Sequence, residues 1–151
     1  MLARFDDAVD RARTAMLVAG ARAESWVDRV RAALFALLSF LDQDPDRARL
    51  LLLGSLAGDA QIRVRRARLL HELADALERG RPAPVADALG APFGPDALVA
   101  GVASILQARV LEDPPPPLGQ LGGSLMAMIV LPQLGVDAAR AELVRGARDA
   151  S

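Results

Sequence analysis

Short stretches rich in alanine and leucine, each bounded by glycine, proline or an Asp-Pro pair, constrain the fold of this chain more than any other feature. Apolar residues make up 52% of the sequence, and most of them are Ala and Leu, which favour helices. β-Branched residues are too scattered to form the alternating pattern of strands. We therefore expect an all-α protein.

Start and stop signals divide the first part of the chain into helices. They are predicted at about residues 5–19, 25–42, 45–57, 59–79 and 96–111. Ser25 can cap the second helix, and Asp44 followed by Pro45 is a strong start signal for the third. The second helix is apolar almost all round from Ala32 onward, so it is expected to be the most buried one.

The carboxy-terminal part is predicted to contain two more helices. Residues 112–117, EDPPPP, must be extended because each proline fixes its own dihedral angle and disfavours helix before it. A sixth helix is expected at about 118–131, with Pro132 in its final turn and Gly135 as its end. Asp137 can then cap a short last helix at about 138–148. The chain would thus form one domain, residues 1–151, of about six to seven helices.

Residues 81–95, RPAPVADALGAPFGP, are rich in proline and glycine and are predicted to form a loop. Such a loop beside a helical scaffold often covers or gates a cavity.

Composition excludes several kinds of chemistry. The chain has no cysteine, which removes disulfides and thiolate sites. All 18 basic residues are arginine, so Schiff-base lysine chemistry is also excluded. The net charge of −1 provides no overall field that would attract nucleic acid or an anionic membrane.

Asp6, Asp7 and Asp10 stand near the predicted start of the first helix, where the helix dipole favours anions. The same aspartates contradict the basic start of a secretory signal. The longest apolar runs, such as residues 50–53, are far shorter than the roughly 18 residues that indicate a membrane span. We therefore expect a cytoplasmic protein that does not cross a membrane.

Two strips of small residues recur at helical spacing near the carboxyl end. The first includes Ala100, Ser104 and Ala108 beside Gly101, and the second Gly119, Gly123 and Ala127. A glycine inside a helix costs about 0.8–1.0 kcal/mol relative to alanine, so these glycines indicate close packing. The strips predict either an intermolecular four-helix bundle across a two-fold axis or close packing of both helices against their own core.

Taken in order, several segments form a familiar series: WVDRVR from Trp26, LLSFL from Leu37, DPDRARL from Asp44, Arg65-Arg66 before Leu69-Leu70, Ala100-Gly101-Val102, and VLPQLG from Val130. This series resembles the carboxy-terminal domain of TetR-type transcriptional regulators, particularly those of actinobacteria. In that family the last motif often has tyrosine where Gln133 stands.

The resemblance implies a sensor and dimerisation domain whose last two long helices pair across a two-fold axis. It also implies a cavity for a small apolar effector among the preceding helices. The candidate lining residues are Met16, Trp26, Val30, Leu34, Leu37, Leu73, Val102, Leu106 and Met126, and Gln107 and Arg109 are possible polar anchors. Family members carry an amino-terminal helix-turn-helix head, which this sequence does not show. DNA binding is thus implied only for the parent architecture, and the chain is either an excised domain or a headless product.

No catalytic, metal or cofactor site is predicted. His71, the single histidine, shares a helical stripe with Asp75 and Glu78, but an exposed stripe of this kind is more typical of a solvated surface. The arginines of residues 63–68 spread around their helix without the aromatic residues that stack bases. Glycines 119–123 follow no strand, which argues against a dinucleotide site. A helical dimerisation or partner-binding module without an effector remains an alternative function.

Overall fold

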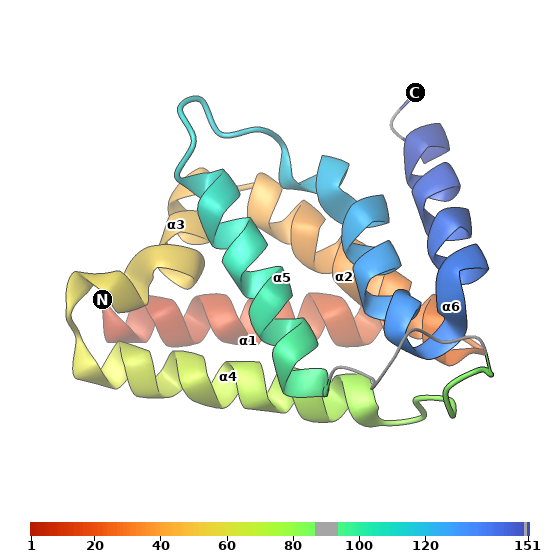
Figure 1. Cartoon of the computed structure of the whole chain (residues 1–151). Coiled ribbons are helices and arrows are strands. Elements are labelled where there is room, and N and C mark those ends of the chain that lie inside the picture. The colour runs from red at the N-terminus through yellow and green to blue at the C-terminus, as the bar shows by residue number, and fades with distance from the viewer. Residues whose placement is uncertain (87–93, 150) are drawn as a thin grey trace.

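The computed structural model describes residues 1–86, 94–149 and 151. Its elements in chain order are α1 (Leu2–Gly20), α2 (Trp26–Asp42), α3 (Pro45–Leu53), η1 (Gly54–Ala57), α4 (Ala60–Glu78), α5 (Pro95–Val110), η2 (Leu118–Leu121) and α6 (Gly122–Asp149), as shown in Figure 1. The described residues include no strand. The predicted all-α class is therefore confirmed.

The predicted start signals of α2 and α3 are confirmed. The Ser25 hydroxyl accepts a hydrogen bond from the Asp28 backbone N–H, 3.1 Å away. The carboxylate of Asp44 accepts bonds of 3.1 Å from two backbone N–H groups in the first turn of α3. Each cap satisfies amides that have no partner inside their own helix.

Two predicted details of the amino-terminal half are wrong. Helix α1 begins at Leu2, so the first turn contains no acidic residue. Asp6 and Asp10 instead lie further along the helix and pair with Arg65 at 3.5 Å and Arg13 at 2.7 Å. The helix predicted to reach residue 57 ends at Leu53, where the tighter turn η1 begins.

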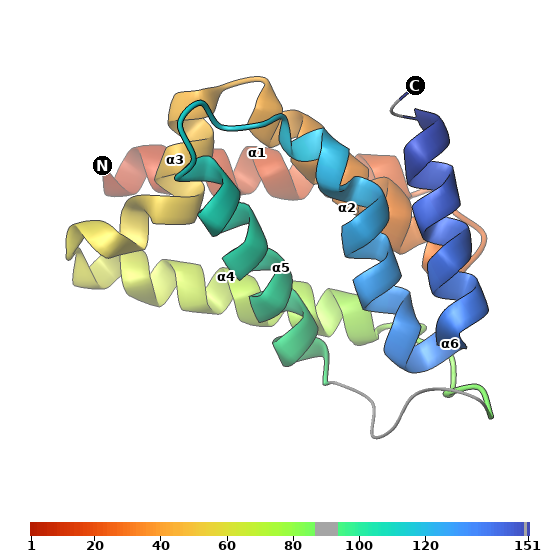
Figure 2. The ribbon, with the colours of Figure 1, turned by 45° about the horizontal axis from the view of Figure 1, so that its top comes forward.

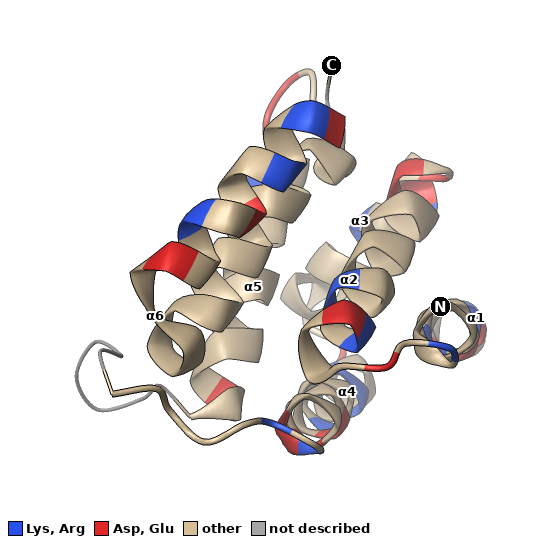
Figure 3. Ribbon diagram, turned by 90° about the vertical axis from the view of Figure 1, so that its right-hand side faces the viewer, with Lys and Arg blue, Asp and Glu red and all other residues tan. Residues whose placement is uncertain are grey.

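Helix α2 lies between α1 and α6, which places it at the centre of the molecule (Figures 1 and 3). Only Asp28, Ser39 and Asp42 are exposed along it. The prediction that it is the most buried helix is wrong, however, because Ser124 is the one exposed residue among residues 122–134 of α6. The side chains of Leu38 and Leu41 are almost completely buried in the core that α2 shares with its neighbours.

Helix α6 is a hairpin rather than one straight helix. Gly135 has φ 86° and ψ −178°, a conformation that is essentially limited to glycine. The chain therefore reverses at Gly135, and residues 136–149, called the arm below, fold back beside residues 122–134 (Figures 1 and 2). Pro132 lies in the last turn before the break, as predicted. The predicted cap at Asp137 is wrong, because the arm is helical from Val136 onward.

Close contact between two glycines holds the arm against the first half of α6. A methyl carbon at Gly123 would lie 2.9 Å from the Cα of Gly146, which is closer than ordinary packing permits. Gly122 makes a similar contact with the ring of Phe35 on α2. Absence of a side chain at these positions thus allows the hairpin to close and to lie on α2.

The segment Leu118–Asp149 is apolar and long enough, by length and composition alone, to cross a membrane, with a mean hydropathy of 1.4 over its most apolar window. Of that window, 56% is buried inside the molecule, as in a core helix of a folded domain. The reversal at Gly135 also divides the segment into two halves that are each shorter than the roughly 20 residues of a spanning helix.

We expect Gly146→Ala to lower the free energy of unfolding by about 1–3 kcal/mol, because the two backbones must move apart. The new methyl carbon would lie 2.7 Å from the Cα of Gly123. Urea unfolding monitored by circular dichroism measures the change.

The matched control is Gly101→Ala, whose methyl carbon would lie 3.6 Å from Cε of Met128, an ordinary contact. This substitution should raise the free energy of unfolding by up to about 1 kcal/mol through helix propensity. Equal effects of the two substitutions would contradict the account of the hairpin.

Candidate functional site

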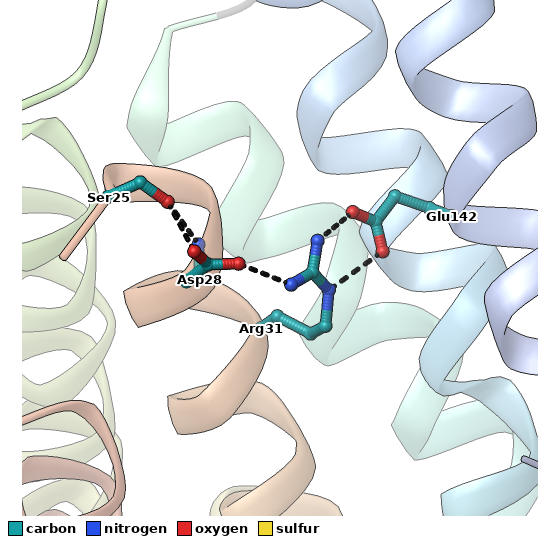
Figure 4. Close-up of polar contacts among 4 residues, drawn as sticks. All are labelled: Ser25, Asp28, Arg31 and Glu142. Carbon is teal, nitrogen blue, oxygen red and sulfur yellow. Dashed lines mark hydrogen bonds and ion pairs between the residues drawn. The ribbon is translucent and has the colours of Figure 1, made fainter. Parts of the chain in front are cut away.

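The start of α2 carries a chain of polar contacts that reaches the arm (Figure 4). The Ser25 hydroxyl donates to the Asp28 carboxylate at 2.8 Å. The other oxygen of Asp28 accepts from the Arg31 guanidinium at 2.7 Å. Arg31 in turn forms two parallel hydrogen bonds with the Glu142 carboxylate on the arm. This bidentate geometry fixes the orientation of both side chains.

The Arg31–Glu142 pair is largely withdrawn from water. The Glu142 side chain is 7% exposed and that of Arg31 is 17% exposed. The hydrogen bonds to Glu142 raise the pKa of Arg31 against the opposing effect of burial. A buried pair of this kind contributes little net stability, because desolvation offsets the attraction, but breaking it leaves an uncompensated charge. We therefore assign it a positioning role.

The same turns of α2 also hold the carboxy-terminal end of α4. The indole N–H of Trp26 donates to the Leu77 carbonyl at 2.7 Å. The Arg29 guanidinium donates to the carbonyl of Arg79 and, at 3.4 Å, to that of Ala76. The carbonyls of Ala76 and Leu77 belong to the last turn of α4, where no helical partner follows, and Arg79 is the residue directly after the helix.

Gln133 ties the start of the predicted loop to α6. Its side chain is buried, and its amide N–H donates to the Pro82 carbonyl. The Gln133 carbonyl accepts from the Val85 N–H at 3.0 Å. Residues 82–85 are therefore fixed near the elbow of the α6 hairpin, whereas residues 87–93 of that loop lie outside the described part of the chain.

The residues predicted to line an effector cavity mostly share one packed core. Trp26, Leu34, Leu106 and Met126 are buried members of a single cluster, and other predicted residues that pack against it are Val30, Leu37 and Val102. Met16 and Leu73 are partly buried but do not belong to that cluster as the described residues define it. The side chain of Met126 is fully buried.

Two hollows of the described surface lie elsewhere. One, of about 240 Å³, lies between α1 and α4 and is lined by Phe5, Val9 and Leu69 together with charged residues. The other, of about 480 Å³, is an open groove between the start of α1 and α3. None of the nine predicted effector residues lines either hollow. The smaller hollow is also below the range of about 300–1,000 Å³ that is typical of ligand pockets.

The two predicted small-residue strips have different positions. On α5, Ala100, Ser104 and Ala108 are all exposed, and Gly101 faces Met128 of α6. On the second strip, Gly123 packs directly against Gly146 of the arm, so it is not available to a second chain.

The other members of the second strip are also engaged within the chain. Ala127 is buried, and Gly119 lies beside the carboxylate of Asp42. Close packing within one chain, the alternative interpretation of these glycines, therefore describes α6, whereas Ala100, Ser104 and Ala108 of the α5 strip are exposed in the described part of the chain.

The exposed positions of α5 and of the first half of α6 that carry no charge are together called the outer face below. Its exposed or partly exposed members are Ala100, Ser104, Ala108, Ser124 and Met128. The chain contains no charged residue from 97 to 108 or from 118 to 136. Figure 3 shows charged residues along the arm and on α1, α2, α3 and α4, whereas most of α5 carries none. An uncharged exposed helix face is unusual, since solvent-facing stripes normally carry charge.

The other candidate groups lie on the surface. His71 is 70% exposed and lies 3.7 Å from carboxylate oxygens of both Asp75 and Asp96, so its second neighbour is on α5 rather than at Glu78. Arg109 pairs with Glu112 at 2.7 Å and is exposed. Within the described ranges no three His, Asp or Glu side chains come close enough to hold a metal ion.

Sequence reasoning missed the contacts that the start of α2 makes. Neither Asp28 nor Arg31 was predicted from the sequence to be a site residue, and nothing in the sequence links Arg31 to Glu142, which is 111 residues away. The Ser-x-x-Asp spacing of Ser25 and Asp28 is the one local signal that was available, because it is similar to a capping box. Gln133 was noted as a departure from the family, but its contacts depend on the tertiary fold.

Comparisons of the chain with protein-family models, curated protein sequences and solved structures give no match. Functional inference therefore depends on the geometry of the outer face and the core, and on the ordered residue signals described above.

We expect Ser25→Ala to raise the pKa of Asp28 toward its ordinary value. The Ser25 hydroxyl is the largest cause of the lowered pKa of this carboxyl, followed by the hydrogen bond from Arg31. A carboxyl with a lowered pKa stabilises the fold at neutral pH, and this stabilisation is lost as the pH falls through the lowered value.

Titration of the Asp28 carboxyl carbon by NMR, in the original chain and in Ser25→Ala, measures the shift. Thr14→Ala is a suitable control, since the Thr14 hydroxyl bonds only the Asp10 carbonyl among the described contacts. An unchanged titration of Asp28 in Ser25→Ala would contradict the assigned hydrogen bond.

Proposed function

We propose that this chain is the homodimerisation and effector-binding domain of a transcriptional regulator similar to the TetR type. The observation that carries the proposal is the uncharged outer face of α5 and α6. DNA would be bound only by a helix-turn-helix head of the kind that such regulators carry. No catalytic residue or cofactor has a part in this function.

Dimerisation is supported by the kind of side chains that the outer face presents. The side chains of Ala100, Ser104 and Ala108 are small, so a second helix can approach α5 closely. Because the face is uncharged, two copies can meet across a two-fold axis without like-charge repulsion. Two α5–α6 pairs would then form a four-helix bundle. The contribution of α6 would come from Ser124 and Met128, since Gly123 and Ala127 are covered within the chain.

Effector binding is supported by the resemblance and by the composition of the core beneath the outer face. Trp26, Leu34, Leu106 and Met126 bring apolar groups from α2, α5 and α6 into one cluster. Methionine side chains rearrange readily, so an apolar effector would enter by displacing them. Effector binding would shift the dimer between two arrangements only by the difference between its affinities for them.

The second candidate function is a helical dimerisation module without an effector. Its specific support is that the predicted lining residues pack against one another and that neither described hollow includes them. Both candidates require the dimer, and they differ only in whether the core accepts a ligand.

We expect Ser104→Arg to convert the dimer into monomers, because the arginine would place an unpaired charge at the centre of the outer face. Ser104 is exposed in the single chain, so the substitution should leave the fold intact. Sedimentation velocity measures the association, and circular dichroism checks the fold.

The control is Thr14→Arg. Thr14 is exposed, and its helix, α1, lies on the opposite side of α2 from α6 (Figure 3). This variant should sediment like the original chain. If both variants sediment alike, the outer face is not the dimer interface.

The two candidate functions are separated by fluorescence of Trp26, the single tryptophan. If the core accepts apolar ligands, a panel of small apolar compounds that do not absorb at the tryptophan excitation wavelength, such as cyclohexane and hexanol, should contain at least one that changes Trp26 emission saturably while the far-ultraviolet circular dichroism stays constant. A flat emission with every compound would favour the module without an effector.

A further inference from the structure

We propose that the first turns of α2 act as a junction that couples the position of the carboxy-terminal end of α4 to the position of the arm. The junction consists of Trp26, Asp28, Arg29 and Arg31. Its two sides hold different elements, and the residues between them belong to one continuous helix.

On the first side, the junction supplies donors that the end of α4 lacks. Trp26 bonds the Leu77 carbonyl, and Arg29 bonds the carbonyls of Ala76 and Arg79. The Trp26 side chain is buried, so its N–H has no access to bulk water as an alternative acceptor. Displacement of α4 would leave these groups without partners unless α2 moved with it.

On the second side, the junction holds the arm through Arg31. Among the arm residues only Ala139 and Glu142 are buried, so apolar contact alone attaches the arm weakly. The bidentate pair with Arg31 and the glycine contact at Gly146 add to its attachment. The electrostatic attraction between Asp28 and Arg145 also adds to it. Asp28 braces Arg31 from within α2, which makes the orientation of the guanidinium depend on the helix itself.

Because both sets of contacts start from one rigid helical segment, a shift at either side changes the geometry at the other. Thermodynamic coupling of this kind is reciprocal. Its use in regulation rests on the proposed function, in which effector binding shifts the dimer between two arrangements. The coupling itself requires neither an effector nor DNA, so it can be tested separately from dimerisation.

Hydrogen exchange of the full chain, followed by mass spectrometry, tests the coupling. In Glu142→Gln the charge-assisted bonds to Arg31 are weakened, so amides of the arm should exchange roughly tenfold faster or more. The amides at the end of α4, such as Arg79 and Arg81, should also exchange several-fold faster, although Glu142 makes no contact with α4 among the described bonds.

The control for this variant is Glu72→Gln, which weakens the exposed pair with Arg13 at 2.6 Å between α1 and α4. It should leave exchange in the arm unchanged. Faster exchange in the arm alone in Glu142→Gln, with the end of α4 unaffected, would overturn the proposal.

Trp26→Phe provides the reciprocal test and decides the matter if Glu142→Gln does not fold. It removes the N–H that bonds Leu77 and keeps most of the buried ring. Exchange should become faster at the end of α4 and, in addition, in the arm. An effect limited to α4 would show that the two sides of the junction are independent.

Discussion

The reversal of α6 at Gly135 is the constraint on which the rest of the structure depends. Only glycine adopts its combination of φ 86° and ψ −178° without large strain, and only glycine at 123 and 146 lets the two halves of the hairpin touch. Without the reversal, the arm would leave α2, Arg31 would lose Glu142, and Gln133 would not stand at an elbow that holds the segment after α4. The hairpin thus fixes both the junction and the outer face.

The outer face follows from how α6 uses its glycines. Gly122 and Gly123 contact α2 and the arm, whereas Ser124 is exposed and Met128, which faces Gly101 of α5, is partly exposed. The resulting surface lacks charge because the sequence lacks charge over both segments. Exposure of this surface to water contributes no stabilisation to a single chain. Two copies that bury it would gain free energy from apolar contact, and no charged group would lose its hydration.

Local signals in the sequence predicted the helices but not their tertiary contacts. Ser25 and Asp44 act within a few residues of their own positions, so their effects were predictable. The contact between Gly123 and Gly146 was not predictable, because a strip of small residues has the same sequence pattern whether its neighbour belongs to the same chain or to another. The break at Gly135 and the helix that follows it were also predicted from local signals, although that helix begins at Val136 rather than after a cap at Asp137.

The most direct measurement of the central claim uses the absence of native cysteine. A thiol introduced by Ser104→Cys should react with a soluble maleimide more slowly as the protein concentration rises, because the outer face becomes covered by a second copy. A thiol introduced by Thr14→Cys should react at a constant rate over the same range. If the thiol at 104 also reacts at a constant rate up to high concentration, the outer face remains uncovered and the account is wrong.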